Sequence, residues 1–176
     1  MYDARVRNVV MVSRLSHEKG IERAIRAMAH VVQQGIPAAL HVVGGGPMEA
    51  FLKETVAEQG MHDSVFFYGE QENPYRYMKN ADLFLMSSFH EAAPMVIDEA
   101  MCLHVPVLTV QTTSSHEMVT MRNGGWVCQN SEEVLSCALI GALSDPTALQ
   151  TLRGTLSGRR ANNDAAAEQF SKLIEG

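Results

Sequence analysis

Two glutamates and a proline within one short stretch, HEAAPMVIDEAM (residues 90–101), are placed where they could form part of a binding site. Proline is disfavoured inside a helix but suits its first turn, so we expect Pro94 to open a helix. Glu91 then lies in the loop before the helix, and Glu99 lies about a turn and a half into it. The two carboxylates therefore do not share one helix face, and an acid–base pair is not predicted.

The start of this predicted helix could hold an anion between the two acids. The first N–H groups of a helix, here those of Met95, Val96 and Ile97, have no intrahelical acceptor and favour negative charge. The carboxylates would repel a bare anion, so we expect them to bind neutral hydroxyl groups, such as the vicinal diols of sugars. A diphosphate flanked by two diol-binding acids predicts a sugar nucleotide as the ligand. Two ordinary surface acids are the alternative, but this explains neither the proline nor the cations described next.

Two cations, Arg14 and Lys19, flank a strand-to-helix turn in SRLSHEKG (13–20). Cations near a helix N-terminus oppose the helix dipole, which favours acids there. An anion bound between them would remove this conflict, because arginine offers a planar fork and lysine a point charge to phosphate oxygens. Two solvated surface cations would explain this loop, taken alone, equally well.

A glycine run, GGGP (44–47), occupies the next strand-to-helix loop. Glycine permits close approach of the backbone to a ligand, and the following helix offers free N–H groups to an anion. The run is not a dinucleotide fingerprint, because Glu49 stands where G-x-G-x-x-G needs Gly or Ala, and no P-loop motif occurs. A tight turn that requires glycine is the favoured interpretation of this loop by itself.

Histidine and cysteine patterns do not predict a metal site or a hydrolase. The dipeptide His-Glu occurs three times, but no copy continues as H-E-x-x-H, and no Ser–His–Asp arrangement is recognisable. We expect three histidines to line the same rim of the sheet: His90, His104 and His116. No pair of cysteines forms C-x-x-C, and we interpret all three as free thiols of a cytoplasmic protein: Cys102, Cys128 and Cys137.

Composition and charge describe an ordinary globular chain. The 176 residues carry 14 basic and 20 acidic side chains, a formal net charge of −6. This argues against a general nucleic-acid surface, which is normally basic, although a local basic cluster can still bind an anion. No apolar run reaches the roughly 20 residues of a membrane span, and no signal-peptide pattern opens the chain. The abrupt entry into a strand suggests a domain cut from a longer protein.

Strands and helices are predicted to alternate along the chain. Apolar, β-branched runs predict six strands, at 6–13, 38–44, 64–69, 82–88, 105–110 and 125–128. Helical spacing and the placement of Pro and Gly predict helices at 20–34, 47–59, 74–80, 94–103, 131–143, 146–156 and 164–174. In the second of these helices we expect Phe51, Leu52 and Val56 to point inward.

This alternation predicts an α/β fold. Apolar strands belong in a parallel sheet covered on both faces, so we expect a Rossmann-like three-layer sandwich with a mostly parallel six-stranded sheet and extra C-terminal helices. Residues 1–176 are predicted to form a single domain, with 146–176 as a helical extension. Ligands of such sheets bind at the carboxyl ends of the strands, where the loops described above lie. A receiver-like signalling domain is disfavoured, because receivers need aspartates at an early strand end and the first strand here ends in Val-Ser-Arg.

Several of these motifs, in order, closely resemble one known family. RLSHEKG, VVGGGP, VFFYG, ADLFLMSS and an E-x7-E followed by VPV are similar to the C-terminal domain of GT-B glycosyltransferases of the retaining family 4 type. The resemblance covers about residues 6–143. It implies binding of a nucleoside-diphosphate sugar, with UDP or GDP as the nucleotide, and no cofactor or catalytic metal. It also implies a hexosyltransferase of polysaccharide or glycolipid synthesis that retains the anomeric configuration, the leaving phosphate oxygen assisting the acceptor.

The resemblance implies roles for individual residues. Arg14 and Lys19 match the basic pair that holds the donor diphosphate and stabilises it as it departs, and Glu91 matches the acid at the transferred sugar. These three are the predicted catalytic residues. Glu99 matches the acid on the ribose hydroxyls, and the loop that begins at Tyr68 is expected beside the base. The predicted donor-binding set is Arg14, Lys19, Gly45, Gly46, Tyr68, Glu91, Ala92, Ala93, Pro94, Met95, Val96 and Glu99.

Three positions depart from the family pattern. Ala92 and His104 each stand where the family usually has glycine, and Ser114-Ser115 replaces a Gly-Gly pair. The expected partner is the N-terminal GT-B domain, which binds the acceptor, in the same full-length chain or a separate one. Without it we expect weak donor binding and little turnover, and we expect membrane contact, at the inner face, only through that half. A non-catalytic nucleotide or sugar-phosphate binding module is the alternative function.

Overall fold

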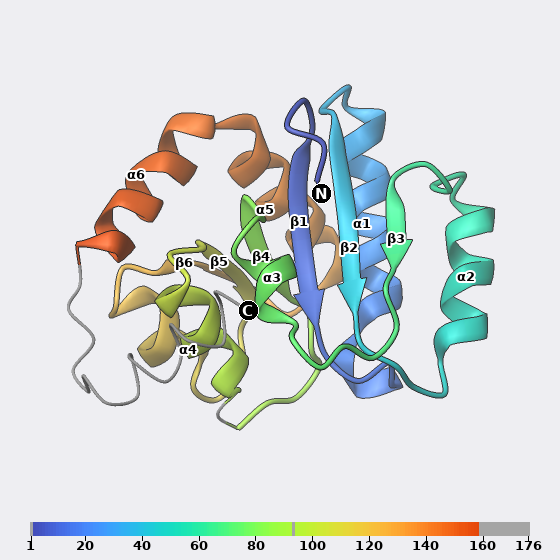
Figure 1. Ribbon diagram of the computed structural model, residues 1–176, viewed down its shortest axis with the longest axis horizontal. Coiled ribbons are helices and arrows are strands. Elements are labelled where there is room, and N and C mark those ends of the chain that lie inside the picture. Colours follow the sequence, from blue (N-terminus) through green and yellow to red (C-terminus); the bar gives the residue numbers. More distant parts are fainter. Residues whose placement is uncertain (1, 93, 159–176) are drawn as a thin grey trace.

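A parallel β-sheet forms the centre of the protein. The computed structural model describes residues 2–92 and 94–158. Its strands, in chain order, are β1 (Arg7–Val12), β2 (Ala38–Val43), β3 (Val65–Phe67), β4 (Leu83–Met86), β5 (Val107–Val110) and β6 (Gly125–Cys128). In the sheet their order is β3-β2-β1-β4-β5-β6, and every neighbouring pair is parallel (Figure 1). The predicted α/β fold is confirmed, with a sheet that is wholly rather than mostly parallel.

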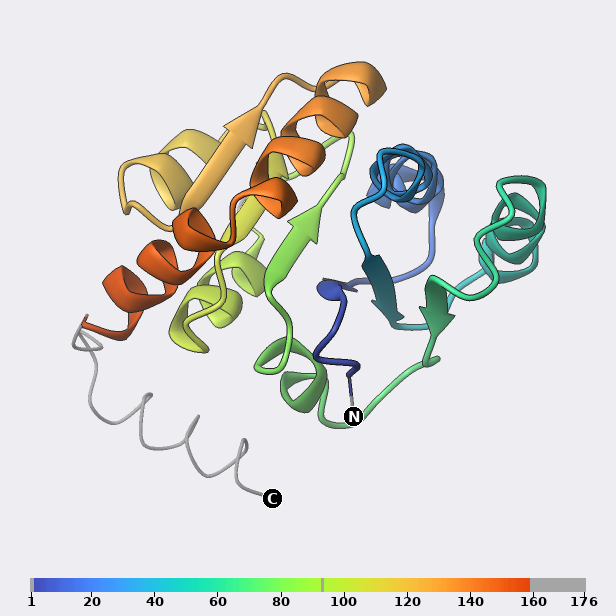
Figure 2. The ribbon, with the colours of Figure 1, turned by 90° about the horizontal axis from the view of Figure 1, so that it is seen from above.

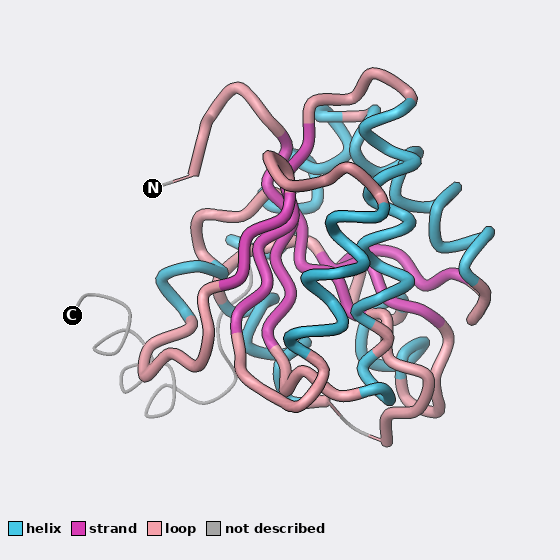
Figure 3. The backbone as a smooth tube through the Cα atoms, turned by 90° about the vertical axis from the view of Figure 1, so that its right-hand side faces the viewer, coloured by secondary structure: helices cyan, strands magenta, loops and turns pink. Residues whose placement is uncertain are grey.

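Helices cover both faces of this sheet, as the views from above and from the side show (Figures 2 and 3). One face packs against α1 (Ile21–Gln33), α2 (Glu49–Glu58) and α5 (Glu132–Ser144). The other packs against α3 (Tyr75–Met78), α4 (Met95–Cys102) and the π-helix η2 (His116–Thr120). Successive residues of β1 serve the two faces in turn, Val9 entering the first buried cluster and Val10 the second. The strands are apolar on both sides for this reason.

Among the described residues, the helix patterns hold in the structure with one exception. In α1, residues at helical spacing bury Ile21, Ile25 and Met28 completely or nearly so. In α2, Leu52 and Val56 are buried as expected, but Phe51 is 42% exposed, so the prediction that it points inward was wrong. Adjacent helix positions differ by about 100° around the axis, and the inward position therefore belongs to Leu52 rather than to its neighbour.

Helix α6 (Pro146–Ser157) joins the two layers. Leu149 belongs to the cluster formed with α1 and α5, whereas Leu156 belongs to the cluster formed with α4. Between them, the Arg153 guanidinium donates a hydrogen bond to the Ala81 carbonyl, just before β4. The predicted helix at 164–174 lies outside the described residues. So does the part of the predicted extension (146–176) that follows residue 158.

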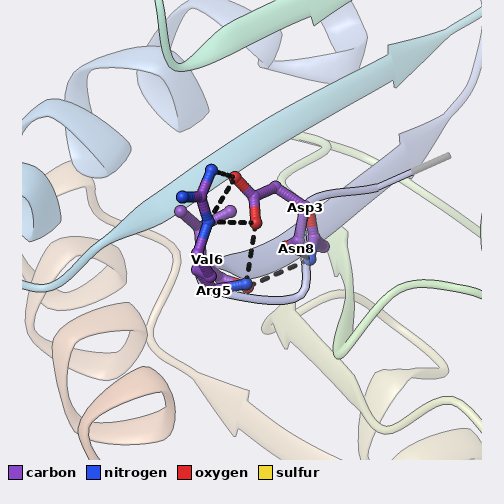
Figure 4. A network of polar contacts seen from close by, with 4 residues as sticks. All are labelled: Asp3, Arg5, Val6 and Asn8. Atoms are coloured by element: carbon purple, nitrogen blue, oxygen red, sulfur yellow. Dashed lines mark hydrogen bonds and ion pairs between the residues drawn. The ribbon is translucent and has the colours of Figure 1, made fainter.

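A network of polar contacts ties the segment before β1 to the sheet (Figure 4). The Arg5 guanidinium binds both carboxylate oxygens of Asp3, at 3.0 and 2.8 Å. The Asn8 side-chain amide donates to the backbone oxygens of Asp3 and Val6, at 3.0 Å each. The Asn8 amide oxygen is therefore left to face the next partner, His41.

His41 lies inside the sheet on β2 and is only 3% exposed. Its Nε2 lies 3.0 Å from the Asn8 amide oxygen, so Nε2 carries the proton and donates it. Its Nδ1 lies 2.9 Å from the Tyr68 hydroxyl, which donates to it. The Tyr2 ring stacks on the imidazole with 3.7 Å between centroids. These contacts define a neutral imidazole, and burial lowers its pKa to about 4.

Candidate functional site

A cavity of about 320 Å³ lies at the carboxyl ends of β1 and β4. The sheet order reverses here, because β1 lies between β2 and β4, and such switch points are where open α/β sheets bind ligands. The polar and helix-start residues that line the cavity come from three segments: Ser13, Arg14 and Lys19 after β1, Ser87, Ser88 and Glu91 after β4, and Pro94, Met95 and Val96 at the start of α4. Six predicted site residues thus lie around one space.

Lys19 and Glu91 contact each other directly. The Lys19 ammonium lies 2.5 Å from one carboxylate oxygen of Glu91, and the Ser88 hydroxyl donates to the same oxygen at 3.0 Å. The side chains are 25% and 17% exposed, so the pair is shielded from water on several sides. An ammonium has three donors, which lets Lys19 keep this contact and bind a phosphate oxygen as well.

Arg14 is the exposed cation at the mouth of the cavity. Across residues 2–92 and 94–158, its guanidinium makes no ion pair or hydrogen bond. Beside it, the Ser13 hydroxyl is buried and has no hydrogen-bond partner in the described part of the chain. The cavity therefore offers an uncompensated positive charge and an unused hydroxyl to an anionic ligand.

Helix α4 begins at the wall of the cavity, as the proline predicted. Pro94 is its N-cap residue, with extended backbone, and no side chain caps the helix. The Ile97 N–H donates to the Pro94 carbonyl at 3.1 Å, so the expectation that it is free was wrong. The N–H groups of Met95 and Val96 lie in the first turn, where the helix itself supplies no acceptor.

Glu99 lies away from the cavity lining, further along α4. Burial raises its pKa, and the neighbouring charge of Asp98 raises it further. Burial raises the pKa of Tyr75 on α3, and the charge of Glu99 raises it further, which places the two side chains near each other. Asp98 itself is paired with Arg122 at 2.6 Å. The Glu99 carboxyl thus lies near Tyr75 of α3.

The glycine run packs against the Arg14 loop. A Cβ on Gly44 would lie 1.9 Å from the Ser13 carbonyl oxygen, and one on Gly46 would lie 2.5 Å from that of Leu15. The Leu15 N–H also donates to the Gly45 carbonyl at 2.9 Å. These contacts favour the structural interpretation, in which glycine lets two loops pack backbone to backbone.

The remaining predicted site residues do not line the cavity or are not described. Tyr68 is bonded to His41, and its ring lies 4.6 Å from that of Tyr77. Ala92 is exposed, and Ala93 lies outside the described residues. Among the described residues, five predicted ones are absent from the cavity lining: Gly45, Gly46, Tyr68, Ala92 and Glu99.

The predicted rim of three histidines is corrected. His90 follows β4 and His116 follows β5, so both lie toward the carboxyl edge, whereas His104 precedes β5 and lies at the amino edge. His104 has a φ of +60°, and it ends α4 with its N–H bonded to the Met101 carbonyl while Val105 bonds back to Ala100. This left-handed helix end is the conformation that glycine adopts without strain.

Two contributors to the site were missed from the sequence. Ser88 binds Glu91, and its signal was its place directly after a buried strand. Arg23 is buried beneath the same loop, where its guanidinium binds the Ser87 carbonyl. Its signal was an arginine within the inward-facing stripe of α1. In the part of the chain that the structure describes, there is no cluster of three potential metal ligands. No described helix is long and apolar enough to span a membrane.

A protein-family model described as "Glycosyl transferases group 1" matches residues 4–173. The chain belongs to this family. The resemblance to family 4-type glycosyltransferases of GT-B fold is thereby confirmed.

Among curated relatives of this group 1 domain is the amylovoran biosynthesis glycosyltransferase AmsK of Erwinia amylovora, which is 30% identical over 95% of this chain and 44% of its own. The crystal structure of WaaG, a glycosyltransferase involved in lipopolysaccharide biosynthesis, matches with a TM-score of 0.82 and 24% identity over 99% of this chain and 48% of its own. Anabaena HepE, in complex with UDP and glucose, matches with a TM-score of 0.78 and 22% identity, over 98% and 47%. The group 1 domain therefore spans about half the length of these proteins.

Proposed function

We propose that this group 1 domain binds a nucleoside-diphosphate sugar in the cavity between β1 and β4. The observation that carries the proposal is the convergence of a free guanidinium, a lysine–glutamate pair and an uncapped helix start around one space of about 320 Å³. Structures of similar fold contain UDP, among them HepE and the pneumococcal O-GlcNAc transferase GtfA. UDP is accordingly the first nucleotide to test, with GDP and ADP beside it.

The diphosphate lies between the first loop and α4 in this proposal. Arg14 supplies a planar fork of donors, Lys19 supplies an ammonium, and the Met95 and Val96 N–H groups complete the cradle. Each of these donors is positive in character and lacks a full set of acceptors in the described chain. The arrangement suits a group with two negative phosphates and would also stabilise charge that grows on the diphosphate as it leaves.

In this proposal the two glutamates bind hydroxyl groups of the two sugars that flank the diphosphate. Glu91, held by Lys19 and Ser88, keeps one carboxylate oxygen outside these contacts for hydroxyls of the transferred sugar. Glu99 lies near Tyr75 of α3, and the ribose would bind on this side with the base beside the loop that begins at Tyr68. Its raised pKa does not prevent hydroxyl binding, because a protonated carboxyl can donate and accept.

We further propose that an N-terminal GT-B domain supplies the acceptor site and that the complete enzyme transfers the sugar with retention, in the cytoplasm, for polysaccharide or glycolipid synthesis. AmsK is named for amylovoran biosynthesis, and WaaG, of similar fold, is involved in lipopolysaccharide biosynthesis; this chain spans about half of each. A non-catalytic binding module is the second candidate. Turnover of a nucleotide sugar in the presence of the N-terminal domain and an acceptor preparation distinguishes the two.

Donor binding is tested by thermal unfolding of this chain with UDP, GDP, ADP and their glucose conjugates. A ligand at about 100 times its Kd stabilises the fold by about 2.7 kcal/mol, a shift of several degrees. The double variant Arg14→Ala/Lys19→Ala is expected to lose this shift. The matched control Arg5→Ala/Lys53→Ala removes two exposed cations elsewhere and should keep it. No shift with any member of the panel would refute the proposal.

A further inference from the structure

Arg23 is a buried cation that makes no ion pair with any described residue. It lies on α1 and is only 5% exposed, and no carboxylate in the described chain lies within ion-pair distance of it. Burial lowers its pKa, and the interactions with Cys128 and Glu132 offset this only in part. A buried charge is tolerated only where its hydrogen-bonding groups are satisfied. The role of Arg23 can therefore be inferred from the groups that its guanidinium binds.

Most of those contacts lead to the loop that carries Glu91, although the Asn130 amide also donates to the Gln111 carbonyl at 3.3 Å. Nε and Nη2 of Arg23 donate to the Ser87 carbonyl, the former at 2.8 Å. Nη1 donates to the Asn130 side-chain oxygen at 2.6 Å. The Asn130 amide then donates to the Phe89 carbonyl at 3.1 Å. One guanidinium thus reaches two points of the loop, one directly and one through Asn130.

Phe89, in the same loop, makes two further contacts that hold the loop in place. Its ring lies 4.1 Å from the centre of the Arg23 guanidinium, a cation–π contact, and its N–H donates to the Glu18 carbonyl at 2.8 Å. Gly20 makes room for the arrangement, because a Cβ there would lie 2.3 Å from the Ser87 oxygen and 2.8 Å from Arg23 Nε. The backbone of residues 87–89 is therefore fixed on both sides.

Ser88 lies at the centre of the fixed segment and holds Glu91 by its hydroxyl. We propose that Arg23 is a positioning residue, which aims Glu91 at Lys19 and at the transferred sugar by fixing residues 87–89. Arg23 itself touches neither residue of the pair, so its effect reaches the site only through the loop. The role at the sugar rests on the proposed function, whereas the fixing of the loop does not.

The loop is tested first without ligand, by hydrogen exchange of the full chain. Arg23→Met keeps the length of the side chain and removes its donors, and exchange at residues 88–91 should accelerate at least about tenfold relative to β1 and β2. Arg26→Met removes the same charge one turn away, from a half-buried pair with Glu22, and should leave the loop unchanged. Equal loop exchange in the two variants would overturn the proposal. Should Arg23→Met not fold, Asn130→Ala, at an exposed position, decides the same question by the same measure.

The effect on the sugar is tested by comparing the Kd values of UDP and UDP-glucose. Arg23→Met should weaken UDP-glucose by about tenfold more than UDP, because only the sugar meets Glu91, and Arg23→Lys should recover part of the difference. A loss of equal size for both ligands would overturn the positioning role, since a general loss of structure weakens both. Absence of binding by the unaltered chain would instead refute the proposed function, and the loop measurement would still stand.

Discussion

Acid destabilisation should reveal the neutral histidine at the centre of the sheet. His41 donates through Nε2 to Asn8 and accepts at Nδ1 from Tyr68, and a second proton would turn the Nδ1 acceptor into a donor facing a hydroxyl. Burial lowers its pKa from 6.5 to about 4 in the folded chain. The unfolded state therefore binds more protons below pH 6.5, and stability contributed by the neutral form falls as the pH falls from 6.5 to 4.

The size of the effect follows from the two pKa values. Between pH 7.5 and pH 5.0 the unfolded imidazole becomes almost fully protonated while the folded one stays mostly neutral, which costs about 2 kcal/mol. Below pH 4 both states are protonated and the contribution stops changing. The loss is a large part of the roughly 5–15 kcal/mol by which domains are stable, so it is measurable by urea unfolding.

The matched variant is His41→Gln, which can keep one of the two polar contacts but does not titrate. It should be less stable than the original chain at pH 7.5, because the stacking with Tyr2 is lost. Its loss of stability between pH 7.5 and 5.0 should nevertheless be about 2 kcal/mol smaller than that of the original chain. Equal losses, with equal m-values, would show that His41 does not titrate across this range and would refute the reasoning.

Three other substitutions test single features by urea unfolding at pH 7.5. His104→Gly should stabilise the chain by about 0.5 kcal/mol, because relief of a left-handed side chain outweighs the extra freedom of glycine in the unfolded state; destabilisation would contradict this. Gly44→Ala should destabilise it by about 3 kcal/mol, because the new Cβ would meet the Ser13 oxygen at 1.9 Å; a change below about 1 kcal/mol would count against a rigid packing of the two loops. Ser131→Ala should cost about 1 kcal/mol, since the serine hydroxyl caps α5 by accepting from Val134, and an unchanged midpoint would argue against the cap.

The strands and most helices could be predicted from the sequence because burial requires apolar residues at regular spacing within each segment. The six residues of β2 are all buried, and its run AALHVV is apolar except for His41. Pro94 likewise marked the first turn of α4 through a purely local restriction on the chain. The left-handed end of α4 could not be predicted in this way, because His104 is not a residue that normally marks such a conformation.

The contacts within the site could not be predicted, because they join distant parts of the chain. Lys19 and Glu91 are separated by 72 positions, and their distance depends on the order of β1 and β4 in the sheet. The role of Arg23 could not be predicted either, because the local sequence pattern suggests the wrong environment for it. In a helical pattern a charged residue usually marks the solvent side, and only the fold shows that this one reaches the end of β4.

The order of the strands also has a consequence for synthesis of the chain. During translation β1, α1, β2, α2 and β3 emerge before β4, and their pairings are complete among themselves, with six register pairs between β1 and β2. Until β4 has left the ribosome, β1 is an edge strand rather than a central one. Its apolar free edge, around Val9 and Val10, is a template on which another nascent chain could pair. The edge of β1 that later pairs with β4 beside the cavity is thus open to misassembly until β4 emerges.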